Sequence, residues 1–560
     1  MHFTTIAALL LTFSSLNLVT LQEKRSFPTD TKSLESSQSL HIRAASAACD
    51  GTLYSQLCVS TLSTFPNLRK KTLPQIISAA VNQTVVQVKA TASNSSTIRR
   101  KIPHLDARDK RALQDCVELL NNTVTELNAA VSDLSSNKSS SKHYYDLQTL
   151  LSGAMTTTRK AAIFDRQNLY TCLDGFAYSD SNVRSYIEDS ITEISRHVSN
   201  SLAMVTKIKE ASRNEVFPGY GRVEGGHPMW LSREDKAMVD ATTEVKYDLV
   251  VAKDGSGNFT TIGEAVAAAP DRSTKRFVIH VKAGAYYEYV EVESKKTMLM
   301  LVGDGIGKTL VKGNRSVVDG WTTFRSATVA VVGNGFIAKG ITFENYAGPS
   351  KHQAVALRSG SDLSAFYQCS FVGYQDTLYV HSLRQFYREC DVYGTVDFIF
   401  GNAAVVFQNC ALYARKPNEN QKNIFTAQGR EDPNQNTGIS IINSKLAAAV
   451  DLIPVQSSFK SYIGRPWKLN SRTIIIRSNI GDLIEPAGWL EWDGDFALST
   501  LYYGEYSNRG PGSNTSSRVT WPGYRVITNA TEASQFSVGN FIQGGEWLNS
   551  TSVPFFLGLS

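Results

Sequence analysis

Two segments of this chain repeat one short pattern, and each ends in an aspartate. Cys369-Ser-Phe-Val-Gly-Tyr-Gln-Asp376 is followed 21 residues later by Cys390-Asp-Val-Tyr-Gly-Thr-Val-Asp397. In both segments a glycine lies four residues after the cysteine and the aspartate lies seven after it. A period of about 20 residues is typical of a solenoid in which each repeat forms one coil. The pattern therefore predicts a stack of parallel β-coils.

This register would place the two aspartates side by side. Equivalent positions of adjacent parallel coils lie about 4.8 Å apart, so Asp376 is expected beside Asp397. Two carboxyl groups at that spacing resist being ionised together, so one keeps a proton near neutral pH. An acid next to an anion is the starting state for acid/base and nucleophilic chemistry. The alternative is a pair of solvated aspartates at strand edges with no catalytic role.

The seven cysteines fall into two sets. Cys49, Cys58, Cys116 and Cys172 lie in the first half of the chain, where an even set predicts two disulfides. A Cys49–Cys58 bond would staple an N-terminal hairpin, and a Cys116–Cys172 bond would tie two long helices. Cys369, Cys390 and Cys410 recur at the coil period and predict a stacked internal column, in which at least one thiol stays unpaired.

The N-terminus predicts export from the cell. Residues 1–22 contain a short apolar run and are interpreted as a signal peptide, although the missing basic flank leaves a retained membrane anchor as the alternative. Many Asn-x-Ser/Thr sequons agree with secretion. The net charge of +6 favours a polyanionic partner. No nucleic-acid motif is present, so an acidic extracellular polysaccharide is the expected partner.

The sequence texture divides the chain into five parts. Residues 23–43 are polar and predicted to be disordered, and residues 44–209 show the 3- and 4-residue apolar steps of an all-α four-helix bundle. Residues 210–244 are rich in turns and form a linker or processing region. Short β-rich runs punctuated by Gly and Asn predict a right-handed parallel β-helix over residues 245–555.

The second half resembles one family, the plant pectin methylesterases, over roughly 245–550. The resemblance lies in Asp254-Gly-Ser-Gly-Asn-Phe, Gly348-Pro-Ser-Lys-His-Gln353, Gly373-Tyr-Gln-Asp376, Gly394-Thr-Val-Asp397-Phe-Ile-Phe-Gly, Gly464-Arg465-Pro-Trp467 and Trp521-Pro-Gly-Tyr. The first half is similar to the pectin methylesterase inhibitor domain that precedes many of these enzymes. The resemblance of the first half lies in its four-cysteine pattern and in the segment Thr171-Cys-Leu-Asp-Gly.

The resemblance implies a role for each residue of the site. Asp397 is expected to be the nucleophile, kept charged by Arg465, and Asp376 the proton donor and later the base. The amides of Gln353 and Gln375 would stabilise the oxyanion. The resemblance further implies that Thr323, Gln353, Arg465 and Trp467 contact the substrate, with Tyr379 and Phe400 as weaker candidates.

Each of these residues also has a purely structural interpretation. Arg465 is explained as a surface arginine, Trp467 as core packing, and Gln353 and Gln375 as stacking amides of a solenoid. No role is assigned to His352 or His381. Neither Gly-x-Ser-x-Gly nor a His-Glu-x-x-His or Cys-x-x-Cys zinc motif occurs, so no serine nucleophile, metal or other cofactor is expected.

Three departures from the family pattern bear on regulation and fit. The linker has only single basic residues, Arg233 and Lys236, in place of a dibasic processing motif, so cleavage of the first domain is in question. The connection from Ser152 to Thr171 is longer than usual. Tyr346 stands where a small or polar residue is more common.

The expected function is that of a secreted, monomeric ester hydrolase of the cell wall. It would remove methyl esters from homogalacturonan, with the first domain restraining the cleft or aiding folding and secretion. A pectate lyase or polygalacturonase on the same solenoid is one alternative, although inverting hydrolases need carboxyl groups about 6.5–9.5 Å apart. The other is a retained, autoinhibited precursor that acts as a pectin-binding or inhibitor protein.

Overall fold

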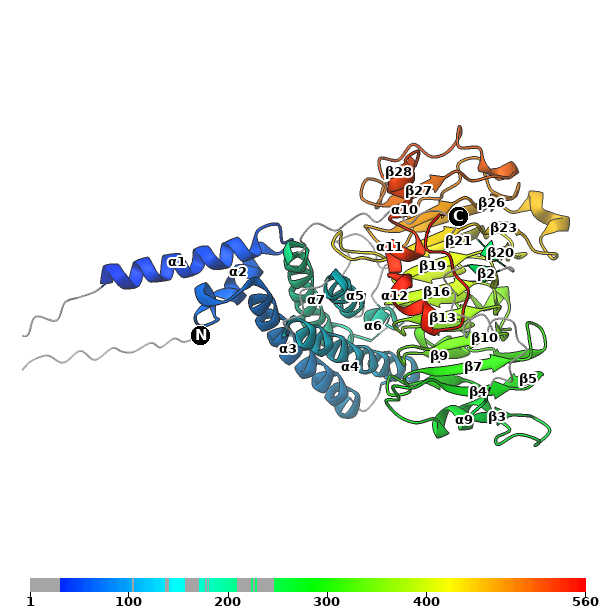
Figure 1. The fold of residues 1–560 in the computed structure, drawn as a ribbon, viewed down its shortest axis with the longest axis horizontal. Helices are drawn as coiled ribbons and strands as arrows, with labels where there is room; N and C mark the ends of the chain where they lie inside the picture. The colour runs from blue at the N-terminus through cyan, green and yellow to red at the C-terminus, as the bar shows by residue number, and fades with distance from the viewer. Residues whose placement is uncertain are drawn as a thin grey trace, which may run out of the picture.

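A computed structural model describes residues 31–102, 105–135, 141–156, 171–176, 179, 181–208, 223–224, 227–228 and 246–559. A helical region leads into a long stack of strands, and the two lie against each other (Figure 1). The predicted signal peptide, Arg233 and Lys236 lie outside the described residues, as does most of the linker apart from β1 (Val223–Glu224) and β2 (His227–Pro228). Among the helices of the described ranges, none is long and apolar enough to cross a membrane.

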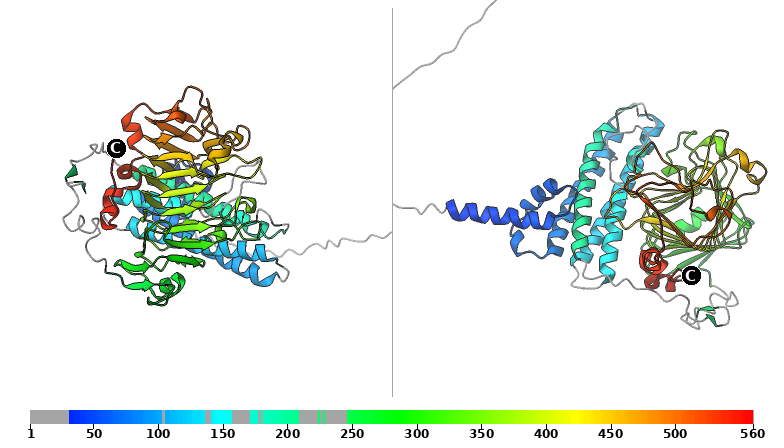
Figure 2. Two further views of the ribbon diagram at one scale, coloured as in Figure 1. Left: turned by 90° about the vertical axis from the view of Figure 1, so that its right-hand side faces the viewer. Right: turned by 90° about the horizontal axis from the view of Figure 1, so that it is seen from above.

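The helical region packs its long helices around an apolar core. Its helices are α1 (Thr31–Cys49), α2 (Ser55–Ser63), α3 (Leu73–Lys101), α4 (Ala107–Ser135), α5 (Ser141–Thr156), α6 (Thr171–Asp174) and α7 (Ser185–Val205). Helix α3 contacts α4 and α7, and α5 contacts the same two (Figure 2). Val81, Leu120, Leu127, Leu151 and Leu202 are buried where these helices meet, as the apolar periodicity predicts.

Helix α1 differs from the expectation for this region. It begins at Thr31 and therefore occupies much of the segment 23–43 that its composition predicted to be disordered. Residues 23–30 lie outside the described part of the chain.

Both predicted disulfides are confirmed. Cys49 of α1 is bonded to Cys58 of α2, and Cys116 of α4 is bonded to Cys172 of α6. The second bond corrects one detail, because α6 has only four residues and is not a long helix. It anchors a short segment to α4 at the side of the helical region that meets the strands.

The strands form three parallel sheets that wind together as a β-helix. Each middle coil gives one strand to each sheet, as in β13 (Ser364–Tyr367), β14 (Ser370–Val372) and β15 (Leu378–Val380). The next coil repeats this with β16 (Arg384–Arg388), β17 (Asp391–Gly394) and β18 (Ile399–Gly401). Ser370 pairs with Asp391 and Leu378 with Ile399, which confirms the 21-residue register.

The remaining strands extend the same three sheets. The eleven-stranded sheet adds β3 (Leu249–Val251), β4 (Phe277–Val281), β7 (Leu299–Gly303), β10 (Ile337–Lys339), β19 (Ala404–Gln408), β22 (Gly438–Ile442), β25 (Arg472–Ile476), β27 (Tyr502–Tyr506) and β28 (Tyr524–Val526). The eight-stranded sheet adds β5 (Gly284–Tyr287), β8 (Thr309–Gly313), β11 (Thr342–Asn345), β20 (Ala411–Ala414), β23 (Lys445–Ala448) and β26 (Asn479–Ile480). The seven-stranded sheet adds β6 (Val290–Val292), β9 (Val329–Val331), β12 (Leu357–Ser359), β21 (Asn423–Gln428) and β24 (Ser461–Pro466).

Inward side chains stack along the axis of the β-helix. The rings of Phe366 and Phe407 each lie 4.6 Å from the ring of Tyr387 between them. Cys369, Cys390 and Cys410 form the predicted internal column, and all three thiols are buried and unpaired. The cysteines that mark the repeat therefore belong to the core.

Two of the three sheets are covered on their outer faces. The helices α10 (Ala530–Ser534), α11 (Val538–Ile542) and α12 (Gly544–Trp547) lie over the eleven-stranded sheet, where Phe541 packs with Ile442 and Ile474. The helical region lies over the seven-stranded sheet, where Leu113 and Leu173 pack with β-helix residues. No apolar cluster of the described residues covers the outer face of the eight-stranded sheet.

Candidate active site

The two repeated aspartates occupy equivalent turns of adjacent coils. Asp376 follows β14 and Asp397 follows β17, each just before a strand of the seven-stranded sheet. Both are buried, and both have a left-handed backbone, with φ of 61° and 50°. That conformation is unfavourable for residues other than glycine and is found at sites where the surroundings hold a side chain in place. Thr377 supports the turn, because its hydroxyl lies 3.0 Å from the carbonyl oxygens of Tyr374 and Tyr393.

Arg465 holds the Asp397 carboxylate with two hydrogen bonds. It lies on β24, two coils beyond Asp397, and donates from Nε at 2.9 Å and from Nη2 at 2.7 Å. This two-point, charge-assisted contact fixes both oxygens and favours the ionised carboxylate. The interpretation of Arg465 as a free surface arginine does not fit this arrangement.

The surroundings of Asp376 favour its protonated form, in contrast to those of Asp397. Burial raises its pKa well above the ordinary value of 3.8, and the neighbouring negative charge of Asp397 raises it further. Arg465 opposes this shift only in part. The pair therefore combines a carboxyl group that favours its proton with a carboxylate fixed by an arginine.

Gln353 and Gln375 lie in adjacent coils at the same edge of the β-helix. Gln375 directly precedes Asp376, and its carbonyl accepts a hydrogen bond from the backbone of Ala354, the residue after Gln353. Both side chains are half-buried. The fold thus brings the two amide groups to the turns that precede β12 and β15.

The predicted aromatic residues cluster on the seven-stranded sheet. Tyr379 and Phe400 pair in register and stack with their rings 4.2 Å apart. Trp467 meets them edge-on, with centroids at 6.5 Å and 6.0 Å. Gly429 permits this approach, because a Cβ there would lie 2.7 Å from the indole.

Thr323 directly precedes Phe324, which belongs to the same buried apolar cluster as Tyr379 and Phe400. It begins the short helix η3 (Phe324–Ser326), and the ring of its neighbour Phe324 lies 5.7 Å from the His381 ring. His381 is buried, and burial together with Arg358 lowers its pKa to about 3. His381 is therefore neutral at physiological pH.

Trp492 is a site residue that sequence reasoning missed. The guanidinium carbon of Arg465 lies 4.3 Å from the centre of its ring, so the indole stacks on the arginine that holds Asp397. The sequence signal was the aromatic segment Trp489-Leu-Glu-Trp492. Its spacing from Arg465 gave no sign that the two residues meet.

The helical region covers this face of the β-helix. Tyr379 and Phe400 are buried in one apolar cluster with Leu113 and Leu173 of the helices. Met155 and Thr156 of α5 line a cavity of about 30 Å³ together with Tyr379 and Trp467. A cavity of that size holds one or two water molecules and no sugar ring.

Charged contacts fasten the helical region at the rim of the site. Arg325 pairs with Asp115 and Glu118 of α4, and Thr322 donates to Asp115 at 2.5 Å. Further contacts join Asp146 to Arg384 at 2.8 Å, Ser199 to Asp432, and Arg108 to the carbonyl of Val317.

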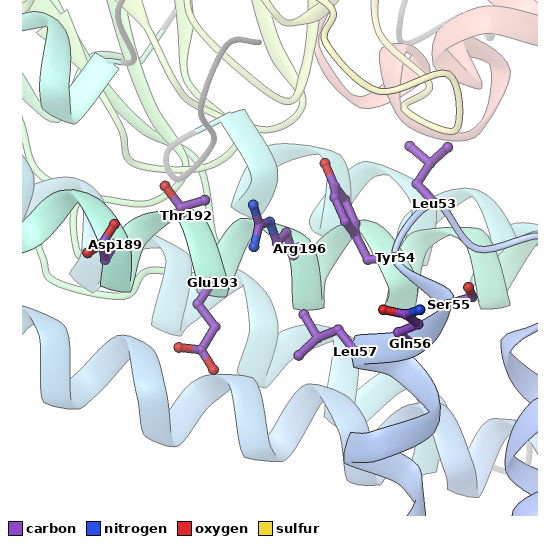
Figure 3. A pocket seen from close by; sticks show the side chains of 9 residues that line it. All are labelled: Leu53, Tyr54, Ser55, Gln56, Leu57, Asp189, Thr192, Glu193 and Arg196. Carbon is purple, nitrogen blue, oxygen red and sulfur yellow. The ribbon is translucent and has the colours of Figure 1, made fainter. Parts of the chain in front are cut away.

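A second, wider cavity lies on the helical region itself. It has a volume of about 670 Å³ and lies between the start of α2 and α7 (Figure 3). Tyr54 and Arg196 project into it, with the guanidinium 5.4 Å from the ring. None of the predicted catalytic residues lines this cavity.

Comparison with known proteins gives the two halves separate matches. The pectinesterase family model matches residues 248–545, and the plant invertase/pectin methylesterase inhibitor model matches residues 43–204. "Probable pectinesterase/pectinesterase inhibitor 39" of Arabidopsis thaliana is 54% identical over 87% of this chain and 90% of its own length. "Pectinesterase 1" of Citrus sinensis is 50% identical over 93% of this chain and 89% of its own.

A solved structure agrees with the enzyme half. The pectin methylesterase from carrot is 59% identical, with a TM-score of 0.56, and covers 57% of this chain and all of its own. An inhibitor-like helical region followed in the chain by a pectinesterase β-helix thus defines the class of protein. The chain belongs to the pectinesterase family and is a pectin methylesterase with an inhibitor-like domain.

Proposed function

We propose that this protein hydrolyses the methyl esters of homogalacturonan with Asp397 as nucleophile. The observation that carries this assignment is the two-point contact from Arg465, which favours an ionised and fixed Asp397 carboxylate. A nucleophilic carboxylate needs both properties. The finer architecture proposed with it is a four-helix bundle of α3, α4, α5 and α7 followed by a right-handed β-helix.

In the first half of the reaction, an Asp397 oxygen attacks the ester carbonyl carbon of a galacturonate unit. The carbonyl oxygen becomes an oxyanion, which accepts hydrogen bonds from the amides of Gln353 and Gln375. One donor of this kind is typically worth about 3–4 kcal/mol of barrier. The bond to the methoxy oxygen then breaks, Asp376 gives that oxygen its proton, and methanol leaves.

In the second half, water hydrolyses the mixed anhydride between Asp397 and the galacturonate. Asp376, now ionised, takes a proton from the water as the hydroxyl oxygen attacks the acyl carbon. The bond to Asp397 breaks, which regenerates its carboxylate and the protonated Asp376 and releases the free galacturonate. Arg465 stays paired with Asp397 at the start and end of each cycle.

The aromatic cluster is proposed to hold the sugar chain. Trp467 offers a ring face for a pyranose, with Tyr379, Phe400 and Trp492 beside it, and Thr323 contributes a hydroxyl at the same face. All of them lie on or next to the seven-stranded sheet, so a polysaccharide running over this sheet would meet them together with the carboxyl pair.

We further propose that the helical domain restrains the enzyme while it is attached. The packing of Leu113 and Leu173 on Tyr379 and Phe400 and the salt bridges of Arg325 to α4 support this, because the helices occupy the face that a substrate chain would use. The protein is expected to be exported to the cell wall as a monomer. A retained, autoinhibited precursor that binds pectin is the second candidate, favoured by the single basic residues at Arg233 and Lys236.

Methanol release from methylesterified pectin tests the proposal. Residues 241–560 should be active, and Asp397→Ala in the same fragment should be inactive; equal release from both rejects the nucleophile. The carrot enzyme, which matches this half alone, supports use of the fragment. The full chain should release methanol more slowly than the fragment, and equal rates would reject the restraint.

A further inference from the structure

The outer face of the eight-stranded sheet carries an ordered set of tyrosines and lysines. Inward residues such as Val311, Phe343, Phe371 and Val392 fill the core, so their strand neighbours point outward. Pairing between strands lines up one outward row along the β-helix axis. In order it consists of Tyr287, Lys312, Glu344, Val372, Tyr393 and Tyr413.

The aromatic members of this row are paired with one another and with cations. Tyr393 and Tyr413 stack with rings 4.8 Å apart, and the Lys445 ammonium lies 5.7 Å from the Tyr413 ring. At the other end, Tyr287 and Tyr346 meet edge-on at 6.2 Å. Lys312 lies 5.9 Å and 5.6 Å from these two rings.

Tyr287 and Tyr346 remain open to solvent, and Tyr393 and Tyr413 are half-buried. Tyr287 is 64% exposed and Tyr346 is 44% exposed. The outer faces of the other two sheets are buried under helices, whereas no apolar cluster of the described residues covers this one. Exposed aromatic residues grouped on one face mark binding surfaces more often than isolated ones do.

The charged side chains on this face leave a small excess of cations. Lys253, Lys312, Arg415 and Lys445 provide four cations, and the acids among them are Glu344, Asp391 and Asp451. Glu344 pairs with Lys312 at 2.9 Å, and Asp451 pairs with Arg415 at 3.1 Å. Lys445 is exposed beside the stacked tyrosines, in position to meet a carboxylate on a ring that packs against them.

This face also leads to the active site. Tyr374 follows β14 of the same sheet and lies two residues before Asp376. Arg415 stacks 4.0 Å over the Tyr374 ring and donates to its hydroxyl at 2.8 Å. A polymer held on the eight-stranded sheet can therefore continue over this turn toward the carboxyl pair.

From this combination we infer that the face formed by Tyr287, Tyr346, Tyr393, Tyr413, Lys312 and Lys445 is a second polysaccharide-binding surface, which takes a chain of uronic acid residues. The ring edges and hydroxyl groups of the tyrosines contact the sugar units, and the lysines pair with free carboxylates. The choice of a polygalacturonate rests on the proposed function, because free carboxylates are the product of that reaction. The surface thus holds the demethylated part of a chain while the active site acts on the esterified part.

Binding by the full chain tests the inference, because the helical domain covers the other candidate surface. The full chain with Asp397→Asn, which prevents turnover, is titrated with de-esterified polygalacturonate at low salt. We expect saturable binding that weakens as salt is raised. Tyr393→Ser with Tyr413→Ser should raise Kd at least fivefold, and Lys312→Glu with Lys445→Glu at least tenfold.

Matched controls distinguish binding at this surface from non-specific attraction of a polyanion. Tyr186→Ser on α7, where the tyrosine is 61% exposed, and Lys295→Glu should leave Kd unchanged. Dextran sulfate supplies charge without the uronic acid rings, and its binding should not respond to the tyrosine substitutions. The inference is overturned if the full chain does not bind polygalacturonate, or if the Lys312→Glu, Lys445→Glu variant keeps the circular dichroism spectrum of the parent and also binds like it.

The outcome is independent of the proposed reaction. If residues 241–560 release no methanol from pectin, the proposed function fails. The polygalacturonate titration would still show whether the surface binds the polysaccharide. If the fragment is active and the surface variants bind normally, only the second surface is rejected.

Discussion

Arg465 lies two coils beyond Asp397 and donates to both of its carboxylate oxygens, at 2.9 Å and 2.7 Å. The residues are 68 positions apart in the chain, and the stacking of coils brings them together. The same stacking places Asp376 where burial and the charge of Asp397 raise its pKa. One arginine therefore makes two chemically identical side chains different.

Arg465→Lys in residues 241–560 should slow methanol release by about 10- to 100-fold. Lysine keeps the charge but cannot make the planar two-point contact, which is worth roughly 1.5–3 kcal/mol. Initial rates from methylesterified pectin measure this. Arg525→Lys, at an exposed ion pair with Glu532, is the control and should keep the parent rate. An unchanged rate for Arg465→Lys would remove the orienting role.

Asp376→Asn should abolish most activity and at the same time stabilise the enzyme. Because the folded pKa of Asp376 lies above its ordinary value of 3.8, ionisation at higher pH opposes burial. The parent therefore loses stability as the pH rises from about 4 toward the folded pKa, and the neutral asparagine does not. Denaturant unfolding at pH 4 and pH 7 should show a gain for the variant that is larger at pH 7. A gain of equal size at both pH values would contradict the assigned shift.

Trp492→Ala should lower activity without removing it. The indole stacks on the Arg465 guanidinium, and an interaction of this kind is worth about 0.5–2 kcal/mol. A loss of roughly 2- to 30-fold in kcat/KM is expected, and Trp492→Phe should recover part of it. Recovery by phenylalanine distinguishes stacking from a hydrogen bond of the indole nitrogen, which phenylalanine cannot replace.

Arg325→Glu in the full chain should increase methanol release toward the rate of the fragment. Arg325 is the shared partner of Asp115 and Glu118 at the domain contact. A glutamate at position 325 would therefore repel both acids and weaken the contact. The same substitution in residues 241–560 is the control and should leave the rate unchanged. If the full chain with this change stays as slow as the parent, these salt bridges do not hold the domain in place.

The restraint by the helical domain should weaken between acidic and neutral pH. Burial raises the pKa of Asp115 to about 6, partly offset by Arg325, and burial raises the pKa of Asp174 to about 7, partly offset by Lys468. If both regain ordinary values near 3.8 on separation, the attached domain binds more protons and is favoured at low pH. The ratio of full-chain to fragment rates should rise from pH 4.5 to pH 7. A ratio independent of pH would exclude these carboxyl groups as the cause.

Much of the fold could be predicted because, in a solenoid, residues separated by one repeat in the sequence lie next to each other in space. The 21-residue repeat predicted the pairing of β14 with β17 and of β15 with β18, and both disulfides followed from cysteine grouping. The disorder predicted up to residue 43 was wrong from Thr31 onward, because α1 continues into a polar stretch with little sequence signal. Trp492 was missed because its distance from Arg465 is not a multiple of the coil period.

The sequence by itself determined the coil register and the adjacent aspartates, since both follow from residues that recur at one period. Its non-periodic motifs determined the class of the protein through their family resemblance. The family resemblance named Arg465 as the partner of Asp397, but only the tertiary structure shows the two-point contact, because the arginine reaches the carboxylate across two coils. The tertiary structure also decided that the helical domain covers Tyr379 and Phe400 while Tyr287 and Tyr346 on the eight-stranded sheet stay exposed. Contacts between the helical domain and the β-helix join residues far apart in the chain and do not recur at the coil period, so only the folded structure reveals them.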